Sequence, residues 1–286
     1  MGIRFRMMQR RNPPQVRSLP VRYGSSNPRR AKPKLGQNFL VSPAAQQAIV
    51  EALGDLSQAA VLEIGPGRGA LTRLLAARAR QVIAVELDAA LAAGLEGIGV
   101  EVLCRDILQV DLTQLAEERG IRLQVIGNLP YYISSPILTH LCAHSRVIDR
   151  AVLMTQREVA DRIVADPGSR DYGLLSATTQ MHAQVENLFT LPPDAFSPPP
   201  EVYSTVIRLT MQPRFEELQV ERAAFLAFLR QIFTQKRKTL VNNLRSAGHS
   251  AAALDKAFRQ CAVDPQVRAE AVSLASMACL FRALID

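Results

Sequence analysis

Short apolar runs alternate with helical stretches through most of this chain, and this alternation restricts the fold more than any other feature. Five runs rich in branched side chains lie at residues 60–64, 82–87, 100–104, 123–126 and 151–155. Such alternation favours right-handed crossovers and a mainly parallel sheet with helices on its faces. Two later runs, at 181–188 and 203–209, are separated only by a proline-rich loop, so we expect an antiparallel hairpin at one edge. The pattern predicts an α/β, Rossmann-like sheet of seven strands.

Helical segments precede and follow the predicted strands in the sequence. Ser42 is a good N-cap, Pro43 suits a first turn, and the helix expected at 44–53 ends at Gly54. After Pro213 the pattern becomes purely helical, with apolar side chains at helical spacing. These side chains are Phe225, Phe228, Leu229, Ile232 and Phe233, and, after a capping Ser273, Leu274, Met277, Phe281 and Leu284. We predict a tail at 1–34, a sheet domain at 35–213 and a helical domain at 214–286.

The positive charge of the chain is concentrated in the tail. The 286 residues carry a net charge of +8, but residues 1–34 hold ten Arg or Lys and no acid, which leaves 24 basic and 26 acidic residues elsewhere. With five prolines as well, the tail is not expected to form a packed element. Three interpretations stay open: an arm that binds RNA phosphates, an organelle transit peptide, or upstream codons included by a wrong start.

Cysteine usage and hydropathy indicate the compartment. No apolar run approaches the roughly 20 residues that cross a bilayer, so we expect no membrane association. The four cysteines (Cys104, Cys142, Cys261 and Cys279) are scattered without a CxxC pair, which favours reduced thiols over disulfides or a zinc site. We therefore expect a cytoplasmic protein, or an organellar one if the tail is a transit peptide.

His140 and His144 have the i, i+4 spacing of metal ligands on a helix. An HExxH arrangement would need an acid beside the first histidine, and the sequence offers neither that acid nor an evident third ligand. We expect ordinary helix residues and no metal.

Residues 61–70 read as a strand, a glycine turn and the start of a helix. Glycines allow a sharp turn and a close approach of ligand to backbone. The spacing Gly65-x-Gly67-x-x-Ala70 fits a dinucleotide loop, Gly65-x-Gly67-x-Gly69 fits an S-adenosylmethionine loop, and a tight turn without ligand is a third interpretation.

Acidic residues follow the next two predicted strands. Glu86 stands where a carboxylate can accept both hydroxyls of a ribose, which suits NAD as well as S-adenosylmethionine. Asp106 follows the third strand, within reach of an adenine amino group. Either residue by itself could be a solvated loop acid.

The segment Asn128-Leu129-Pro130-Tyr131, after the fourth strand, suggests a reaction. An exocyclic base amine is a poor nucleophile because its lone pair is delocalised into the ring. The Asn128 amide oxygen and the Leu129 carbonyl could each accept one of its hydrogens and aim the lone pair at a sulfonium methyl. Pro130 fixes the backbone of this turn, and Tyr131 offers a flat face for an unstacked base. Catalysis would then consist mostly of orientation.

Taken together, the ordered motifs of residues 32–286 resemble those of the ribosomal RNA adenine dimethyltransferases. The matching motifs are Gly36-Gln37-Asn38-Phe39-Leu40, Glu63-Ile64-Gly65-Pro66-Gly67, Glu86-Leu87-Asp88, Asp106, Asn128-Leu129-Pro130-Tyr131, Phe196-Ser197-Pro198-Pro199-Pro200 and Phe233-x-x-Lys236-Arg237-Lys238. The resemblance implies a class I fold that uses S-adenosyl-L-methionine, with a seven-stranded sheet and a small helical domain.

The resemblance also implies roles for single residues. Asn38 and Leu40 would contact the methionine end of the cofactor, Gly65 would line its loop, Glu86 would bind the ribose and Asp106 the adenine. Asn128 would meet both the cofactor and the target amine, and Phe196 could cover the base face opposite Tyr131.

The implied substrate is the small-subunit (16S-type) ribosomal RNA, free or in an assembling small ribosomal subunit. Methyl groups would go to N6 of two adjacent adenosines in its 3′-terminal hairpin loop, during ribosome biogenesis, and we expect the enzyme to be a monomer. The basic cluster Lys236, Arg237 and Lys238 reads as a solvated helix end or an RNA contact, and the resemblance favours phosphate binding. One departure is Tyr132, where the commonest family form has Asn.

Other functions remain to be distinguished. A large-subunit adenine methyltransferase of the macrolide-resistance type shares the fold and the chemistry. A non-catalytic assembly or transcription factor could use the same domain, although the intact Asn128–Tyr131 segment argues for retained catalysis. A nicotinamide oxidoreductase is a more distant alternative.

Overall fold

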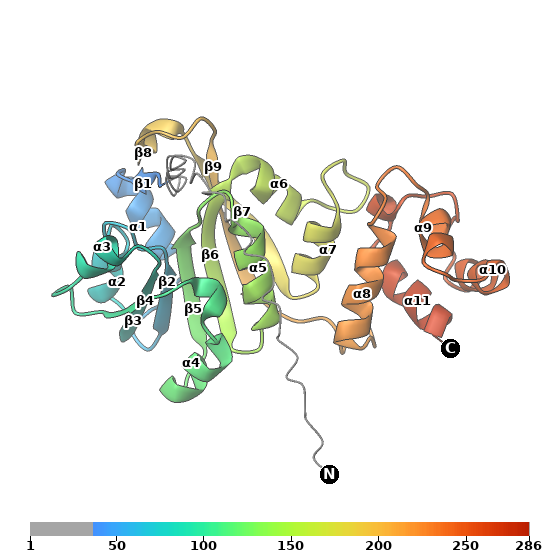
Figure 1. Cartoon of the computed structure of the whole chain (residues 1–286), viewed down its shortest axis with the longest axis horizontal. Coiled ribbons are helices and arrows are strands. Elements are labelled where there is room, and N and C mark those ends of the chain that lie inside the picture. The colour runs from blue at the N-terminus through green and yellow to red at the C-terminus, as the bar shows by residue number, and fades with distance from the viewer. Residues whose placement is uncertain (1–36, 286) are drawn as a thin grey trace, which may run out of the picture. The chain divides into compact units, whose positions relative to one another are not determined.

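The apolar runs form one sheet in the computed structural model, which describes residues 37–285. The strand order is β4-β3-β2-β5-β6-β9-β7, and Figure 1 shows these strands side by side. The strands of this sheet are β2 (Ala60–Ile64), β3 (Gln81–Glu86), β4 (Glu101–Cys104), β5 (Leu123–Asn128), β6 (Ile148–Gln156), β7 (Ala183–Leu191) and β9 (Ser204–Met211). The predicted seven-stranded α/β fold is confirmed, whereas the predictions for the tail lie outside the described residues.

The direction of the strands also follows the prediction. Strands β2 to β6 pair in parallel, and β9 runs antiparallel to both β6 and the edge strand β7. The chain builds outward from β2 through β3 to β4, and then returns to place β5 on the other side of β2. The strand order therefore reverses between β2 and β5, and the loops after these two strands diverge. Open parallel sheets bind ligands at a reversal of this kind, which is called a topological switch point.

Helices connect the strands and complete the chain. They are α1 (Pro43–Glu51), α2 (Thr72–Ala76), α3 (Ala89–Ala93), α4 (Leu112–Arg119), α5 (Ser134–Ala143), α6 (Arg157–Val164), α7 (Leu174–Gln180), α8 (Arg222–Ile232), α9 (Leu240–Ser246), α10 (Ala251–Gln260) and α11 (Leu274–Ile285), with 3-10 turns η1 (Ile107–Gln109), η2 (Pro193–Ala195) and η3 (Ala269–Ala271). Helix α1 begins as expected, because the Ser42 hydroxyl accepts the Ala45 amide at 3.4 Å. Between residues 37 and 285, no helix is both long and apolar enough to span a bilayer.

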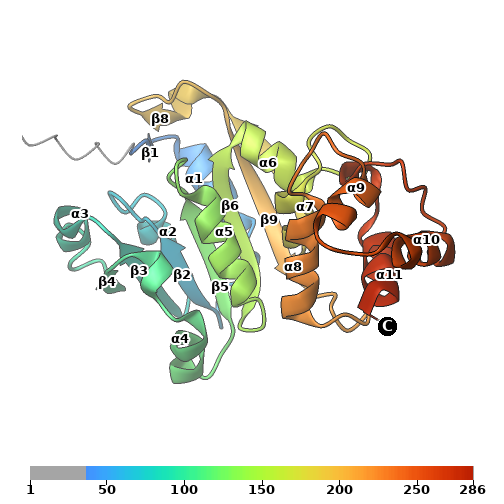
Figure 2. The ribbon, with the colours of Figure 1, turned by 45° about the vertical axis from the view of Figure 1, so that its right-hand side comes forward.

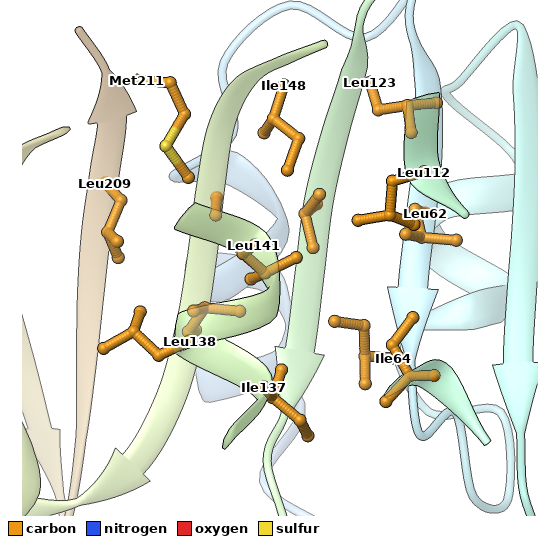
Figure 3. Packing of buried hydrophobic residues seen from close by; sticks show 14 of the residues in the cluster. Leu62, Ile64, Leu112, Leu123, Ile137, Leu138, Leu141, Ile148, Leu209 and Met211 are labelled. Atoms are coloured by element: carbon orange, nitrogen blue, oxygen red, sulfur yellow. The ribbon is translucent and has the colours of Figure 1, made fainter. Parts of the chain in front are cut away.

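The sheet is covered on both faces, which explains why its central strands are apolar along their whole length. In β2 the side chains alternate: Leu62 and Ile64 belong to one buried cluster, and Val61 to the other. Helix α5 covers the first face, and Figure 3 shows Ile137, Leu138 and Leu141 of α5 lying over the strands. Residues of α1 and α2 cover the opposite face.

Helices α8 to α11 share a third buried cluster. This cluster also includes Ala177 of α7, and Tyr172 and Met181 on either side of that helix in the chain. Arg222, at the start of α8, donates to the carbonyls of Cys142 and Ala143 at the end of α5, at 3.0 and 2.8 Å. Residues 35–286 group as one compact unit. The division between a sheet domain and a helical domain at residue 213 stays a prediction.

Two short strands were not predicted. β1 (Phe39–Leu40) and β8 (Phe196–Ser197) pair antiparallel, with Phe39 opposite Ser197 and Leu40 opposite Phe196. Figure 2 shows this pair beyond one end of the sheet. This is the end at which the parallel strands have their carboxyl ends. Strands of two residues carry too few side chains for a periodic signal, so only the folded chain reveals them.

The prediction that all cysteines are reduced thiols is wrong. Cys261 and Cys279 form a disulfide with Cα atoms 5.8 Å apart, whereas Cys104 and Cys142 are free. The two bonded residues are 18 positions apart, and the fold brings the end of α10 against α11. Spacing along the chain cannot reveal such a contact between helices.

A single added methyl group at Gly127 should destabilise the fold. A Cβ there would lie 2.9 Å from the Ile64 carbonyl oxygen and 3.1 Å from the Ile64 Cβ, in the central β2–β5 pair. Overpacking of this kind costs about 1–3 kcal/mol, so urea unfolding of Gly127→Ala should show that loss. Gly173→Ala is the control, because a Cβ at Gly173 meets no atom within 4 Å; equal stability of the two variants would contradict the prediction.

Candidate active site

A cavity of about 410 Å³ lies at the carboxyl ends of the parallel strands, within the size range of small-molecule sites. It is bounded by β1 and by the loops after β2, β3, β4 and β5. The site residues predicted there all line it: Asn38, Leu40, Gly65, Glu86, Asp106, Asn128, Leu129, Pro130 and Tyr131. The structure thus brings together segments that are separated by up to 93 residues in the chain.

The glycine turn is held in place by Glu86. The Gly67 amide donates to Glu86 Oε2 at 3.0 Å, and the Asp88 amide donates to Oε1 at 3.0 Å. Gly67 has a φ of +56°, and a Cβ at this position would lie 3.0 Å from Phe39 Cε1. Glycine is therefore required both by the backbone conformation and by the closeness of β1.

Asp106 has one carboxylate oxygen engaged in the fold. Its Oδ1 accepts the Leu108 amide at 2.9 Å and so caps η1. Capping fixes the orientation of the side chain. Its second oxygen is the one available to a ligand in the cavity that Asp106 lines.

Glu63 also lines the cavity, and it was quoted within a motif but given no role by the sequence analysis. Its side chain is 1% exposed, and its Oε2 has no hydrogen-bond partner within the described part of the chain. The pKa of the Glu63 carboxyl is raised to about 7, mainly by burial; the Thr72 side chain opposes this rise, and the nearby Glu86 charge contributes to it. A carboxylate in an otherwise apolar buried strand, directly before a glycine turn, was the signal that could have found it.

The Asn128 side chain is oriented by the N-terminal segment. Its Nδ2 donates to the Asn38 carbonyl at 2.9 Å, across 90 residues of sequence. The amide nitrogen is thus occupied, and the structure gives the Oδ1 no hydrogen bond within residues 37–285. Asn128 can therefore offer its oxygen as an acceptor to a group in the cavity.

The turn after Asn128 leaves the Leu129 carbonyl available as an acceptor. The Leu129 amide donates to the Met154 carbonyl at 2.9 Å, and the Pro130 carbonyl accepts from the Ile133 amide and from the Ser134 hydroxyl at 3.1 and 3.0 Å. No donor among the described residues reaches the Leu129 carbonyl. The two acceptors selected from the sequence, Asn128 Oδ1 and Leu129 O, thus both lack a donor within the described residues.

Tyr131 is fixed through its hydroxyl group. The Tyr131 hydroxyl and the Ser204 hydroxyl lie 2.7 Å apart, which links the turn after β5 to the start of β9. Partial burial raises the pKa of the Tyr131 phenol, so the ring stays neutral at ordinary pH. A neutral aromatic ring held at a cavity wall can stack on a planar ligand.

Phe196 does not take the position that was predicted for it. Its side chain is 3% exposed, belongs to the core and does not line the cavity. As the partner of Leu40, it fills the space beneath β1. Phe196 therefore supports the N-terminal segment instead of covering a base, and pairing between distant strands is what the sequence could not reveal.

The basic cluster lies outside the helices, whereas the two histidines have structural contacts at α5. Lys236, Arg237 and Lys238 are exposed in a turn between α8 and α9, so they do not form a helix end. His140 contacts the Val110 carbonyl at 3.0 Å, and His144 contacts the His140 carbonyl at 2.9 Å. These contacts account for both histidines as structural residues of α5.

The geometry suits transfer of a group to a planar amine. Two acceptors can orient the amine, an aromatic ring can hold its face, and carboxylates line the deeper part of the cavity. Holding two reactants in a reactive geometry can lower a barrier by several kcal/mol, on the order of 7–11 in favourable cases.

Comparison with known proteins agrees with this chemistry. Residues 29–286 match the family described as "Ribosomal RNA adenine dimethylase". "Ribosomal RNA small subunit methyltransferase A" of Acidobacterium capsulatum is 55% identical over 281 residues, covering 96% of this chain and 97% of the relative. The protein of the same name from Koribacter versatilis is 52% identical over 269 residues, covering 88% of this chain and 94% of the relative.

Solved structures show the same fold. The 23S rRNA methyltransferase ErmE has a TM-score of 0.67 at 27% identity, covering 87% of this chain and all of that one. A dimethyladenosine transferase from Plasmodium falciparum has a TM-score of 0.69 at 24% identity, covering 85% of this chain and 95% of that one. With its switch-point cavity and its nearly full-length relatives, this chain belongs to the ribosomal RNA adenine dimethylase family and is an rRNA methyltransferase.

Proposed function

We propose that the enzyme transfers methyl groups from S-adenosyl-L-methionine to N6 of two adjacent adenosines in the 3′-terminal hairpin loop of small-subunit rRNA, during assembly of that subunit. The observation that carries the proposal is the pair of unused acceptors, Asn128 Oδ1 and Leu129 O, at the wall of the cavity. Two acceptors are what an exocyclic NH₂ group needs to be held with its lone pair aimed at a neighbouring reactant.

The cavity fits the proposed cofactor. Glu63 and Glu86 supply buried carboxylate oxygens, and one of them, Glu63 Oε2, lacks a protein donor among the described residues. S-Adenosyl-L-methionine carries positive charge and supplies an electrophilic methyl group. Asn38 and Leu40 would hold its methionine end and Gly65 would line its loop, while Glu86 would hold its ribose and Asp106 its adenine.

Orientation would then account for most of the catalysis. The Asn128 amide, fixed by Asn38, would accept one hydrogen of the target amine, and the Leu129 carbonyl would accept the other. Tyr131, fixed by Ser204, would stack on the adenine ring. The Asn128–Asn38 hydrogen bond would couple cofactor binding to orientation of the amine, because both residues face the same cavity.

Support for the small-subunit substrate comes from the relatives. Both proteins at more than 50% identity carry the name of a small-subunit methyltransferase and match over nearly their full length. The alternative, a large-subunit enzyme, is favoured only by the more distant ErmE structure. We also propose that the protein acts as a monomer in the cytoplasm, where an assembling subunit would be available.

Transfer of labelled methyl groups onto purified ribosomal subunits tests this proposal. We expect S-adenosyl-L-methionine to label undermethylated small subunits at two adjacent adenosines, because the acceptor pair can hold any adenine amine but the RNA surface selects the loop. Large subunits from the same cells are the matched control. Labelling of large subunits alone would support the alternative substrate and contradict the proposal.

The Asn128→Ala variant tests the orienting role of the side chain. We expect the single-turnover rate of methyl transfer to fall by about 100-fold or more, because an orienting group is lost. Binding of S-adenosylhomocysteine, measured by calorimetry, should change much less than the rate. A variant that transfers methyl groups at the wild-type rate would show that Asn128 has no such role.

Glu63 should make stability depend on pH. The pKa of this carboxyl is about 7 in the folded protein, whereas the ordinary value for a glutamate, taken for the unfolded chain, is 4.5. The folded chain therefore binds a proton more tightly than the unfolded chain does. The stabilisation of the folded state by this proton is fully present below pH 4.5 and is lost as the pH rises through about 7. The total change in the free energy of unfolding is roughly 3 kcal/mol. The unfolding free energy of Glu63→Gln should therefore fall less than that of the wild type between pH 5 and 7.5, as measured by urea titration. Parallel pH profiles for the two proteins would contradict this assignment.

A further inference from the structure

Exposed apolar side chains gather at the end of the sheet where the cavity lies. Of the seven large apolar residues that are exposed in the described part of the chain, six lie just after a strand at the cavity edge or just before β9. The six are Val41, Leu87, Leu108, Tyr132, Val202 and Tyr203. The first residue of β9 pairs with the last residue of β6, so the start of β9 lies at the same edge as the carboxyl ends of the parallel strands.

Two tyrosines in this group flank the hydrogen bond that fixes Tyr131. Tyr132 follows Tyr131 in the chain, and Tyr203 precedes Ser204, whose hydroxyl lies 2.7 Å from that of Tyr131. Tyr132 is 62% exposed and Tyr203 is 50% exposed, and Tyr132 also lines the cavity. The two exposed rings therefore lie next in the chain to the two residues, Tyr131 and Ser204, whose hydroxyl groups are hydrogen-bonded beside the proposed site of the target base.

Arg157 adds a cation to this surface. Its amide donates to the Tyr203 carbonyl at 3.0 Å, and its guanidinium carbon lies 5.7 Å from the centre of the Tyr203 ring. An acid, Asp161, approaches the guanidinium only at 4.0 Å, and both side chains are exposed. Arg68 and Arg105 are further exposed cations that line the same cavity.

Resting on the proposed function, we propose that Tyr132, Tyr203 and Arg157 form a stacking platform for the unpaired nucleobase next to the adenosine in the cavity. Single-stranded RNA is bound by aromatic rings and guanidinium planes that stack on its bases, with cations near its phosphates. The reaction needs such a surface, because two adjacent adenosines cannot enter one cavity together. While one base lies against Tyr131, its neighbour needs a flat surface directly outside the mouth.

Tyr132 is a large exposed ring directly after Tyr131 in the chain. The amine-orienting acceptors precede Tyr132 in the chain, so the platform acts on placement of the RNA and not on the transfer itself.

Fluorescence of a modified RNA tests the platform directly. The probe is a short single-stranded RNA with two adjacent adenosines, of which one is replaced by 2-aminopurine, and the full-length protein is saturated with S-adenosylhomocysteine. Stacking on a ring quenches 2-aminopurine, so we expect wild-type protein to quench it. The Tyr132→Ala and Tyr203→Ala variants should lose the quench and bind the RNA about tenfold more weakly each.

Conservative variants and a distant charge serve as controls. Tyr132→Phe and Tyr203→Phe keep a flat ring and should retain quenching and affinity. Arg157→Gln should weaken binding more than Arg78→Gln, because Arg78 lies after α2, toward the opposite edge of the sheet where β3 begins. The far-ultraviolet circular dichroism spectrum and the midpoint of urea unfolding should stay at the wild-type values in all of these variants, which shows that they are folded.

An RNA that lacks the neighbouring base separates stacking from a structural effect. With an abasic nucleotide at that position, wild type and the two alanine variants should bind equally. A Tyr→Ala variant that keeps the full quench overturns the platform, as does a loss of affinity that persists on the abasic RNA. Failure of the proposed function appears in a different assay: wild-type protein would leave small subunits unlabelled.

Discussion

The pairing of β2 with β5 is the constraint on which the rest of the structure depends. The chain leaves β2 in one direction across the sheet and returns on its other side, so the loops after these two strands separate and leave a cavity between them. Gly127 allows the two strands to approach closely, because any Cβ there would lie against Ile64. The glycine turn and the Asn128 turn are therefore placed opposite each other by backbone pairing alone.

Hydrogen bonds between distant loops then give the cavity its chemistry. Glu86 holds the Gly67 amide, Asn38 holds the Asn128 amide, and Ser204 holds the Tyr131 hydroxyl. These contacts fix the glycine turn, the Asn128 side chain and the Tyr131 ring at the cavity. The polar groups beside Asn128 Oδ1 and Leu129 O already have partners within the protein. These two acceptors therefore remain for a ligand.

The departures from prediction share one physical cause, which is contact between segments far apart in the sequence. Phe196 is buried because β8 pairs with β1, and Cys261 meets Cys279 because two helices pack together. Glu63 was quoted only as part of a motif, although burial next to Glu86 changes its proton affinity. The exposed rings of Tyr132 and Tyr203 become one surface only when Tyr131 meets Ser204.

Local patterns in the sequence determined the seven strands, the capped helix after Ser42 and the hairpin at the sheet edge. They also indicated the glycine turn, Glu86, Asp106 and the Asn128–Tyr131 segment, whereas Asn38 and Leu40 came only from the family resemblance. The local patterns could do so because strand periodicity, capping and glycine turns are read over a few neighbouring residues, and because carboxyl ends of parallel strands meet at one edge. The tertiary structure alone decided which atoms of those residues are already bonded, and so which remain for a substrate. Hydrogen-bond partners and burial depend on contacts across as many as 90 residues, and no local pattern contains them.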